Sequence, residues 1–173
     1  MMMSMLEAGG LEPYTDGLRK SDEDNPKGYY EVERVKGLKT QEDKSWVAAA
    51  EGKVIKVVSS ILRDLPPAYH YQVVFSNRKL EEVLASQNKM RLRRGDSAES
   101  DDTTLMRLYE QHLRSIKAWM ATQANFRFLD VDYADAIERP ADQAERIRSF
   151  LGVPLDVGRM SSAVDRELYR NRG

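Results

Sequence analysis

Three short runs rich in β-branched and aromatic residues, set among longer helix-forming stretches, constrain the fold of this chain more than any other feature. They are Val54–Val58, Tyr71–Phe75 and Phe128–Tyr133. Strands that alternate with helices along a chain form parallel sheets that helices cover on both faces. The nearly all-apolar run at Tyr71–Phe75 is typical of a strand buried on both faces. The sequence therefore predicts an α/β fold with a parallel sheet.

Helix signals lie before, between and after these runs. Asp101 opens the longest predicted helix, which ends near Thr122. Pro140 and Gly152 are start and stop signals for another. The remaining predicted helices cover Met1–Ala8, Val32–Leu38, Leu80 to about Leu92, and Asp156–Val164.

The chain starts within a helix-like stretch. Met1–Leu6 is almost wholly apolar and Gly9-Gly10 follows it, but no capping residue precedes it. Either this is a frayed, Met-rich terminus, or the reading frame starts inside a helix. Because three strands make a small parallel sheet, we expect at least one strand before Met1. We expect a single domain over residues 1–173 that is incomplete at its N-terminus, with a long polar loop region at 11–45 and a C-terminal helix and tail at 156–173.

The composition excludes several classes of function. The chain has no cysteine, which excludes a disulfide framework, a thiolate zinc site and a cysteine nucleophile. His70 and His112 are far apart in sequence, so we expect no metal. A net charge of −1 gives no argument for nucleic acid or an anionic membrane surface as a partner. No apolar run reaches the roughly 20 residues that span a bilayer, and no basic segment precedes the apolar N-terminus, so we expect a cytoplasmic protein.

The most informative stretch for chemistry begins at the end of the second run. Arg78 follows the predicted strand, a helix begins at once, and Ser86 lies eight residues after Arg78. Ligands of open α/β sheets bind beyond the carboxyl ends of the strands, and a guanidinium group can hold a phosphate bidentately. We therefore predict that Arg78 and Ser86 face one phosphate site, with Arg78 not fully buried. Alternatively, Arg78 pairs with Glu81 or Glu82, and Ser86 is a small helix-packing residue.

Together with two further motifs, these residues resemble those of sulfotransferases that use 3′-phosphoadenosine 5′-phosphosulfate (PAPS), particularly bacterial sulfotransferase-like P-loop proteins. The further motifs are Asn25-Pro26-Lys27-Gly28-Tyr29-Tyr30-Glu31, and Leu129–Asp135 followed by Pro140 and Phe150-Leu151-Gly152. The resemblance covers about residues 1–155. It implies that Arg78 and Ser86 bind the 3′-phosphate of PAPS. It also implies a three-layer P-loop-type parallel sheet flanked by helices, and sulfuryl transfer to an acceptor hydroxyl or amine without a metal.

The chain departs from this family pattern in three places. The family's phosphosulfate loop, between its first strand and first helix, has no counterpart here, so we expect a domain that lacks the first, central strand and this loop. We expect such a chain to be inactive and poorly soluble as given. The catalytic histidine of the cytosolic animal enzymes is absent, because Val58-Ser59-Ser60 occupies its region. Arg170 and Arg172 do not match the basic C-terminal loop of those enzymes.

Sulfuryl transfer needs a general base, because the acceptor loses a proton as it attacks. Glu31 is the first candidate, since it ends the first of the two further motifs, and Glu33 is the second. The alternative is that both carboxylates are solvated. Lys56 is a third candidate, because the family often has a lysine there near the phosphosulfate. The alternative for Lys56 is that its stem packs along the end of the sheet.

Two other groups of residues have structural interpretations. We interpret His112, beside Tyr109 and Ile116 in the long helix, as a structural residue. A basic cluster follows the Leu80 helix and consists of Lys89, Arg91, Arg93 and Arg94. It complements the C-terminal end of that helix or, alternatively, guides an anionic cofactor toward the site.

Two classes of function stay open. The first is a PAPS-dependent sulfotransferase, and the alternative is a non-catalytic remnant or a nucleotide- or partner-binding α/β module. An ATP-dependent phosphotransferase is disfavoured, because no apolar strand ends in the aspartate that would hold Mg²⁺. If the resemblance holds, the missing strand lies between Tyr71–Phe75 and Phe128–Asp132, which leaves a gap of about 9.6 Å. Val54–Val58 then pairs in parallel with Tyr71–Phe75.

Overall fold

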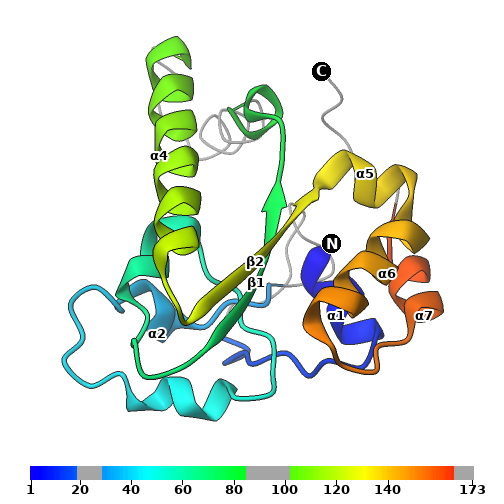
Figure 1. The fold of residues 1–173 in the computed structure, drawn as a ribbon, viewed down its shortest axis with the longest axis horizontal. Coiled ribbons are helices and arrows are strands. Elements are labelled where there is room, and N and C mark those ends of the chain that lie inside the picture. Colours follow the sequence, from blue (N-terminus) through cyan, green and yellow to red (C-terminus); the bar gives the residue numbers. More distant parts are fainter. Residues whose placement is uncertain (19–28, 85–101, 166–173) are drawn as a thin grey trace.

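The computed structural model describes residues 1–18, 29–84 and 102–165 of the chain (Figure 1). Several predictions concern residues outside these ranges and are not tested by the structure. They are the predicted phosphate ligand Ser86, the motif residues Asn25–Gly28, the basic cluster at Lys89–Arg94, and the tail residues Arg170 and Arg172.

The sheet of the described residues consists of two parallel strands, as the alternation of strands and helices predicted. Strand β1 (Tyr71–Asn77) pairs with strand β2 (Phe126–Asp132) in a continuous register. The pairing runs from Tyr71 opposite Phe126 to Asn77 opposite Asp132. The predicted strand positions are therefore confirmed, apart from shifts of one or two residues at their ends.

The predicted gap between these two strands is wrong. Because β1 and β2 are hydrogen-bonded to each other along their whole length, no space for a further strand separates them. Apolar partners on both faces support this direct pairing, since partners point to the same face: Val73 lies opposite Phe128, and Val74 lies opposite Leu129. If the family's first strand is present in a longer form of this protein, it does not lie between β1 and β2 as they are arranged here.

The prediction of a strand at Val54–Val58 is also wrong. Only Val54 makes a β-bridge, and its partner is Pro13, with hydrogen bonds to the backbone of Glu12 and Tyr14. Val57 packs instead into the clusters that lie beneath β1. Val54, Ile55 and Val57 are partly buried against the core clusters, whereas Val58 is 53% exposed. A β-branched run can therefore pack as an extended segment with little backbone pairing, because strand propensity depends strongly on side-chain context.

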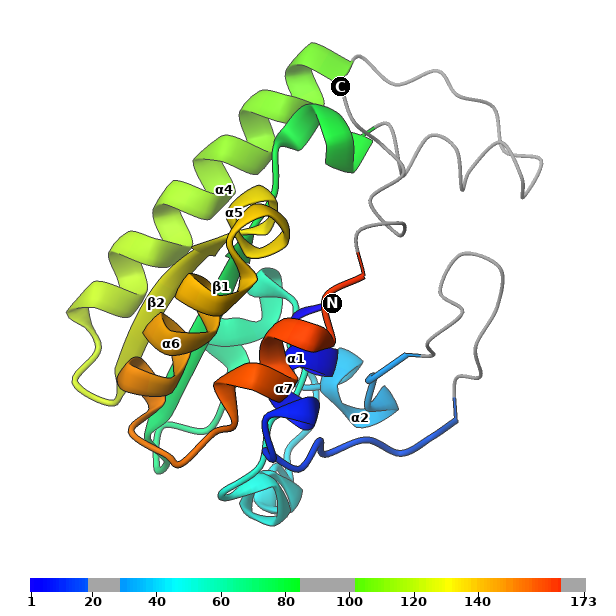
Figure 2. The same cartoon turned by 90° about the vertical axis from the view of Figure 1, so that its right-hand side faces the viewer.

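Helices cover both faces of the sheet (Figures 1 and 2). Helix α4 (Asp102–Thr122) lies along one face, where its buried residues Ile116 and Met120 contact Phe75 and Phe126. The opposite face is covered by helices that come from both ends of the described chain. They are α1 (Met2–Ala8), α6 (Pro140–Leu151) and α7 (Val157–Ser162).

Helix α1 forms where the apolar start of the chain predicted a helix, and it buries Met5 and Leu6. Met5 and Leu6 are in the core cluster with Met160 of α7, and the Asp156 N–H donates to the Gly9 carbonyl oxygen over 2.9 Å. The contact at Gly9 is so close that a Cβ added there would lie 2.6 Å from Met160 Cγ. The start of the chain is therefore packed on its last described helix.

Local signals account for the ends of α6 and for one helix that was not predicted. Pro140 begins α6, and Gly152 follows it with a φ of 68°, the left-handed conformation that favours glycine. Helix α5 (Tyr133–Glu138) begins where the sequence predicted the last residue of a strand. The Asp132 carboxylate accepts a hydrogen bond from the Ala134 N–H over 2.9 Å and so ends β2 and caps α5.

In its described residues, the predicted loop region at 11–45 contains one short α-helix, where the sequence predicted a helix at Val32–Leu38. Its described residues include α2 (Glu33–Lys36), shorter than the predicted helix, and the 3₁₀ helix η1 (Ser45–Ala50) begins at its end. A second 3₁₀ helix, η2 (Ser59–Asp64), precedes β1. Residues in and beside α2 and in η1 form their own buried cluster: Val32, Val35, Leu38, Trp46 and Val47.

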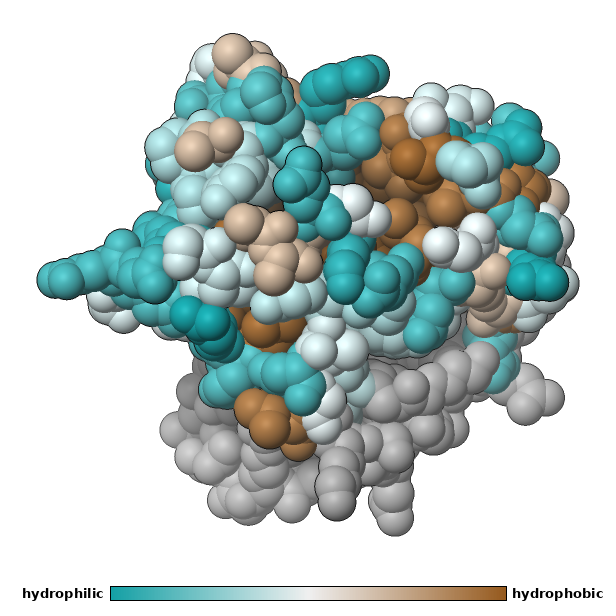
Figure 3. Space-filling model, turned by 90° about the horizontal axis from the view of Figure 1, so that it is seen from below, coloured by the Kyte–Doolittle hydropathy of each residue, from teal (hydrophilic) through white to brown (hydrophobic). Residues whose placement is uncertain are grey.

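Apolar surface is unevenly distributed over the face that Figure 3 shows. Apolar side chains gather on the side where Figure 1 places α1, α6 and α7. Several apolar residues that pack against the cluster around Met5 are only partly buried: Met1, Met2, Leu11, Val54, Val74, Leu129, Leu151, Val157 and Val164. The core on this side of the sheet therefore leaves part of its apolar surface exposed to solvent.

Candidate functional site

The candidate site lies at the carboxyl ends of the two strands. Because Asn77 pairs with Asp132, the next residues, Arg78 and Tyr133, leave the sheet side by side. The guanidinium carbon of Arg78 lies 4.9 Å from the centroid of the Tyr133 ring. A cation over an aromatic face is attracted by the ring quadrupole, so this contact stabilises one orientation of the Arg78 side chain.

A buried carboxylate makes the second contact of Arg78. Residues 80–84 are helical, and Glu82, in the first turn, is only 5% exposed. Arg78 Nε donates to Glu82 Oε2 over 2.9 Å, whereas the Arg78 side chain is 27% exposed. Arg78 is thus not fully buried, as predicted, and the alternative pairing with Glu82 is present. Whether Ser86 faces the same site is not tested, since it lies outside the described residues.

Tyr133 was not recognised from the sequence as a site residue. Burial raises the pKa of its phenol above the ordinary value, the nearby Arg78 opposes this shift, and Glu82 adds to it. The phenol is therefore neutral at physiological pH. The signal that could have identified Tyr133 is Asp132, whose preference for helix N-termini indicates that the strand stops just before the tyrosine.

A polar cluster on the opposite side of β1 fixes the strand ends to helix α4. Lys117 Nζ lies 2.6 Å from Asp130 Oδ1 and donates to Asn77 Oδ1 over 2.9 Å, while Asn77 Nδ2 donates to the same Asp130 oxygen over 2.8 Å. Burial raises the pKa of Asp130, but the hydrogen bonds from Asn77 and Lys117 and the charge of Lys117 outweigh it and hold the pKa below its ordinary value. No local sequence pattern predicted this cluster, because its members come from three separate elements.

Two of the three predicted catalytic residues contact each other. Lys56 Nζ lies 3.3 Å from Glu31 Oε1, with exposed fractions of 40% for the Lys56 side chain and 22% for that of Glu31. The Glu31 backbone oxygen also accepts a hydrogen bond from Thr15 Oγ1 over 3.1 Å. A carboxylate can accept a proton and an ammonium group can stabilise negative charge, so this pair has the chemistry that the prediction required.

Glu33 does not share this contact. Its carboxylate pairs with Lys36 within α2 over 2.7 Å, and both side chains are largely exposed. Its backbone N–H donates to Asp16 Oδ2 over 2.6 Å, and this hydrogen bond is the main cause of the lowered pKa of Asp16. The structure thus gives Glu33 a place at the start of a short helix and brings Glu31, rather than Glu33, to Lys56.

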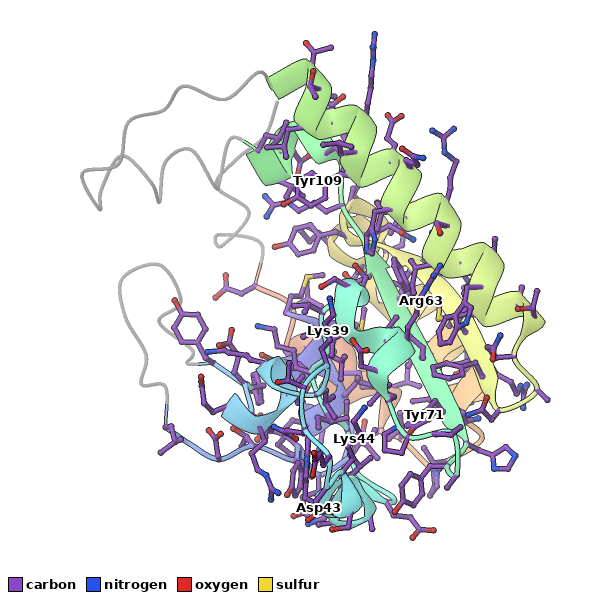
Figure 4. All side chains as sticks on the ribbon, turned by 90° about the vertical axis from the view of Figure 1, so that its left-hand side faces the viewer. Lys39, Asp43, Lys44, Arg63, Tyr71 and Tyr109 are labelled. Carbon is purple, nitrogen blue, oxygen red and sulfur yellow. The ribbon has the colours of Figure 1, made fainter. Side chains whose placement is uncertain are left out.

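His112 lies against the segment that follows Val54–Val58. Its Nε2 is 2.9 Å from Ser59 Oγ, and the pair lies beside an open groove of about 410 Å³ between η2 and α4. Figure 4 shows Arg63 between these elements, where its Nη2 donates to Ser115 Oγ over 2.9 Å. The groove is lined by Ser60, Arg63, Leu108, Gln111, His112, Ser115 and Ile116. The hydrogen bond to Ser59 fits the structural role that we predicted for His112.

The described residues contain neither a metal-binding cluster nor a membrane-spanning helix. Among residues 1–18, 29–84 and 102–165, no group of three or more histidine, cysteine, aspartate or glutamate side chains could hold a metal ion. No helix in this described part of the chain is both long and apolar enough to cross a bilayer.

Fold and site together define an α/β protein with a parallel sheet and an oriented arginine at the carboxyl ends of its strands. The family model described as "Sulfotransferase family" matches residues 38–157, and the chain belongs to this family. The matched range contains Lys56 and Arg78 but begins after Glu31. The comparisons with curated proteins and with solved structures found no match.

Proposed function

We propose that this protein is a PAPS-dependent sulfotransferase in its full-length form, which transfers a sulfuryl group to an acceptor hydroxyl or amine. The observation that carries the proposal is the position of Arg78 at the carboxyl ends of β1 and β2, in a chain that belongs to the sulfotransferase family. The proposed ligands of the 3′-phosphate are Arg78 and Ser86. A guanidinium group at this position offers paired donors to a phosphate.

The proposed chemistry uses the Glu31–Lys56 pair. PAPS supplies the activated sulfuryl group. Glu31 accepts the proton that the acceptor hydroxyl or amine loses, and Lys56 stabilises negative charge on the transferring group. Glu33 is the second candidate for the base, and the contact of Glu31 with Lys56 favours Glu31. No metal takes part in this proposal.

The proposal also includes a segment that the given sequence does not contain. The family's phosphosulfate loop, which supplies backbone N–H groups to the sulfuryl donor, has no counterpart in these 173 residues. We therefore propose that residues upstream of Met1 supply the loop and that the chain as given does not turn over. Translation of the DNA upstream of Met1 tests this: an apolar strand followed by a Gly- and Ser/Thr-rich loop supports the proposal, and an in-frame stop codon contradicts it.

The test of the phosphate site compares two nucleotides on the full-length protein by calorimetry. Adenosine 3′,5′-bisphosphate carries the 3′-phosphate and adenosine 5′-monophosphate lacks it. Arg78→Met should weaken binding of the bisphosphate about 10- to 150-fold, as expected for the loss of a charge-assisted bidentate contact. Binding of the monophosphate should change less than twofold. Equal loss for both nucleotides, or no loss for either, contradicts the assignment of Arg78.

One observation favours a second function, a nucleotide-binding module without catalysis. Because β1 and β2 pair directly, the described sheet has no position between them for a strand that leads into a phosphosulfate loop. Formation of adenosine 3′,5′-bisphosphate from PAPS in the presence of a panel of hydroxyl and amine acceptors distinguishes the two functions. Turnover that is lost in Glu31→Gln supports the sulfotransferase. Nucleotide binding without turnover in the full-length protein supports the module.

A further inference from the structure

The side chain of Glu82 is more deeply buried than that of the arginine it contacts. It is 5% exposed and lies in the first turn of the helix that follows Arg78. A buried carboxylate is unfavourable unless a charged partner and hydrogen bonds compensate for lost hydration. Arg78 provides such a partner through its Nε at 2.9 Å. The carboxylate is thus retained within a few ångströms of a proposed phosphate site, although its charge opposes phosphate binding.

Two contacts from different elements restrain the guanidinium group of Arg78. Glu82 accepts a hydrogen bond from Nε, and the guanidinium carbon lies over the Tyr133 ring, 4.9 Å from the ring centroid. Tyr133 is itself held in place, because Asp132 caps α5 and Asp130 is bound by Asn77 and Lys117. A hydrogen bond at Nε together with a contact to an aromatic ring restricts the guanidinium group more than either contact alone.

We propose that Glu82 and Tyr133 are positioning residues that orient Arg78 and thereby set the preference of this protein for nucleotides with a 3′-phosphate. This inference rests on the proposed phosphate-binding role of Arg78. Glu82 holds the guanidinium through Nε, and the face of the Tyr133 ring contacts the guanidinium. The bound phosphate then meets a guanidinium group that is already oriented, which reduces the ordering required on binding.

Charge and positioning predict opposite effects for one substitution, and this makes the inference testable. Glu82→Leu removes a negative charge near the site, so charge alone predicts tighter binding of adenosine 3′,5′-bisphosphate. Positioning predicts weaker binding, because the guanidinium loses its Nε contact. Glu81→Leu is the matched control, since it removes the same charge from an exposed neighbour in the same helical turn.

The experiment measures, for each variant of the full-length protein, the ratio of dissociation constants for adenosine 5′-monophosphate and adenosine 3′,5′-bisphosphate. We expect Glu82→Leu and Tyr133→Leu each to lower this ratio at least fivefold. Glu81→Leu should not lower it. The conservative variants Glu82→Gln, which keeps an acceptor, and Tyr133→Phe, which keeps the ring, should restore most of the preference. A general structural defect would weaken binding of both nucleotides and leave the ratio unchanged.

The outcomes separate this inference from the proposed function. If Arg78→Met abolishes the preference while Glu82→Leu and Tyr133→Leu stay within twofold of the wild type, the positioning role is wrong and the phosphate role of Arg78 stands. If Arg78→Met leaves the preference unchanged, the phosphate role itself is wrong. Circular dichroism checks the fold of each variant. Should Arg78→Met not fold, Arg78→Met/Glu82→Leu, which leaves neither charge in place, replaces it.

Discussion

Replacement of Arg78 by methionine should destabilise the protein because it removes the cation beside a buried carboxylate. Loss of one partner from a fully buried ion pair costs about 3–5 kcal/mol. Arg78 is 27% exposed, so water can partly replace it, and we expect a cost near the lower end, about 2–3 kcal/mol. The contact with the Tyr133 ring contributes about 0.5–1 kcal/mol of this total. Methionine keeps most of the apolar stem, which isolates the effect of the charge.

Urea denaturation followed by circular dichroism measures this change as a shift in the transition midpoint at constant slope. The control is Arg78→Met/Glu82→Leu, which should lie within about 1 kcal/mol of the wild type, because replacing both partners of a buried pair by apolar residues is often neutral. The reasoning is refuted if Arg78→Met costs less than about 0.5 kcal/mol, or if the double variant is as unstable as the single variant.

Three further predictions concern other parts of the structure. Lys117→Met should destabilise the protein by about 1–2 kcal/mol at pH 7 and make it less sensitive to acid. Because the pKa of Asp130 is lowered in the folded state, its ionised carboxylate stabilises the protein above the pKa of the unfolded state, and this stabilisation is lost as the pH falls through the folded pKa. Denaturation measured between pH 2 and 6 tests whether the variant loses this pH dependence. Burial raises the pKa of Tyr71 to about 12, so between pH 10 and 12 the phenol ionises more readily in the unfolded state and the wild type loses stability as the pH rises. Tyr71→Phe removes this phenol and should make that loss smaller, as measured by alkaline denaturation. Gly9→Ala should cost about 1–3 kcal/mol in urea denaturation, because the new Cβ meets Met160 Cγ at 2.6 Å, and a combined Gly9→Ala/Met160→Val variant should recover part of the loss.

The elements that could be predicted are those whose signals are local. Pro140 and Gly152 define the ends of α6 without reference to the rest of the chain, and the long α4 has an apolar stripe of its own. The prediction of a strand at Val54–Val58 was wrong, because the same β-branched composition also suits an extended segment that makes a single β-bridge, at Val54. The pairing of β1 with β2 also could not be derived, since a resemblance to a family gives strand order and not the contacts of this chain.

The candidate site was partly predictable for the same reason. The sequence predicted Arg78 as a site residue because it directly follows a strand, and it offered Glu82 as one alternative partner because Glu82 lies at the start of the helix that begins just after Arg78. The contact of Glu31 with Lys56 was not predicted, because the two residues are 25 positions apart and no local pattern links them. Tyr133 was missed because the end of β2 was placed one residue too late.

The parallel pairing of β1 with β2 has a consequence for synthesis of the chain. Contacts across this sheet join distant residues, such as Asn77 and Asp130, which are 53 positions apart. During translation β1 therefore leaves the ribosome well before β2 has been synthesised. Until then its backbone groups are unpaired with β2, and its apolar side chains are not covered by α4 until that helix has also been synthesised. Sheets built from such non-local contacts form slowly, because loop closure precedes the gain from pairing. The rate at which a ribosome translates the region between β1 and β2 thus sets how long a nascent chain is exposed to chaperones and to neighbouring chains.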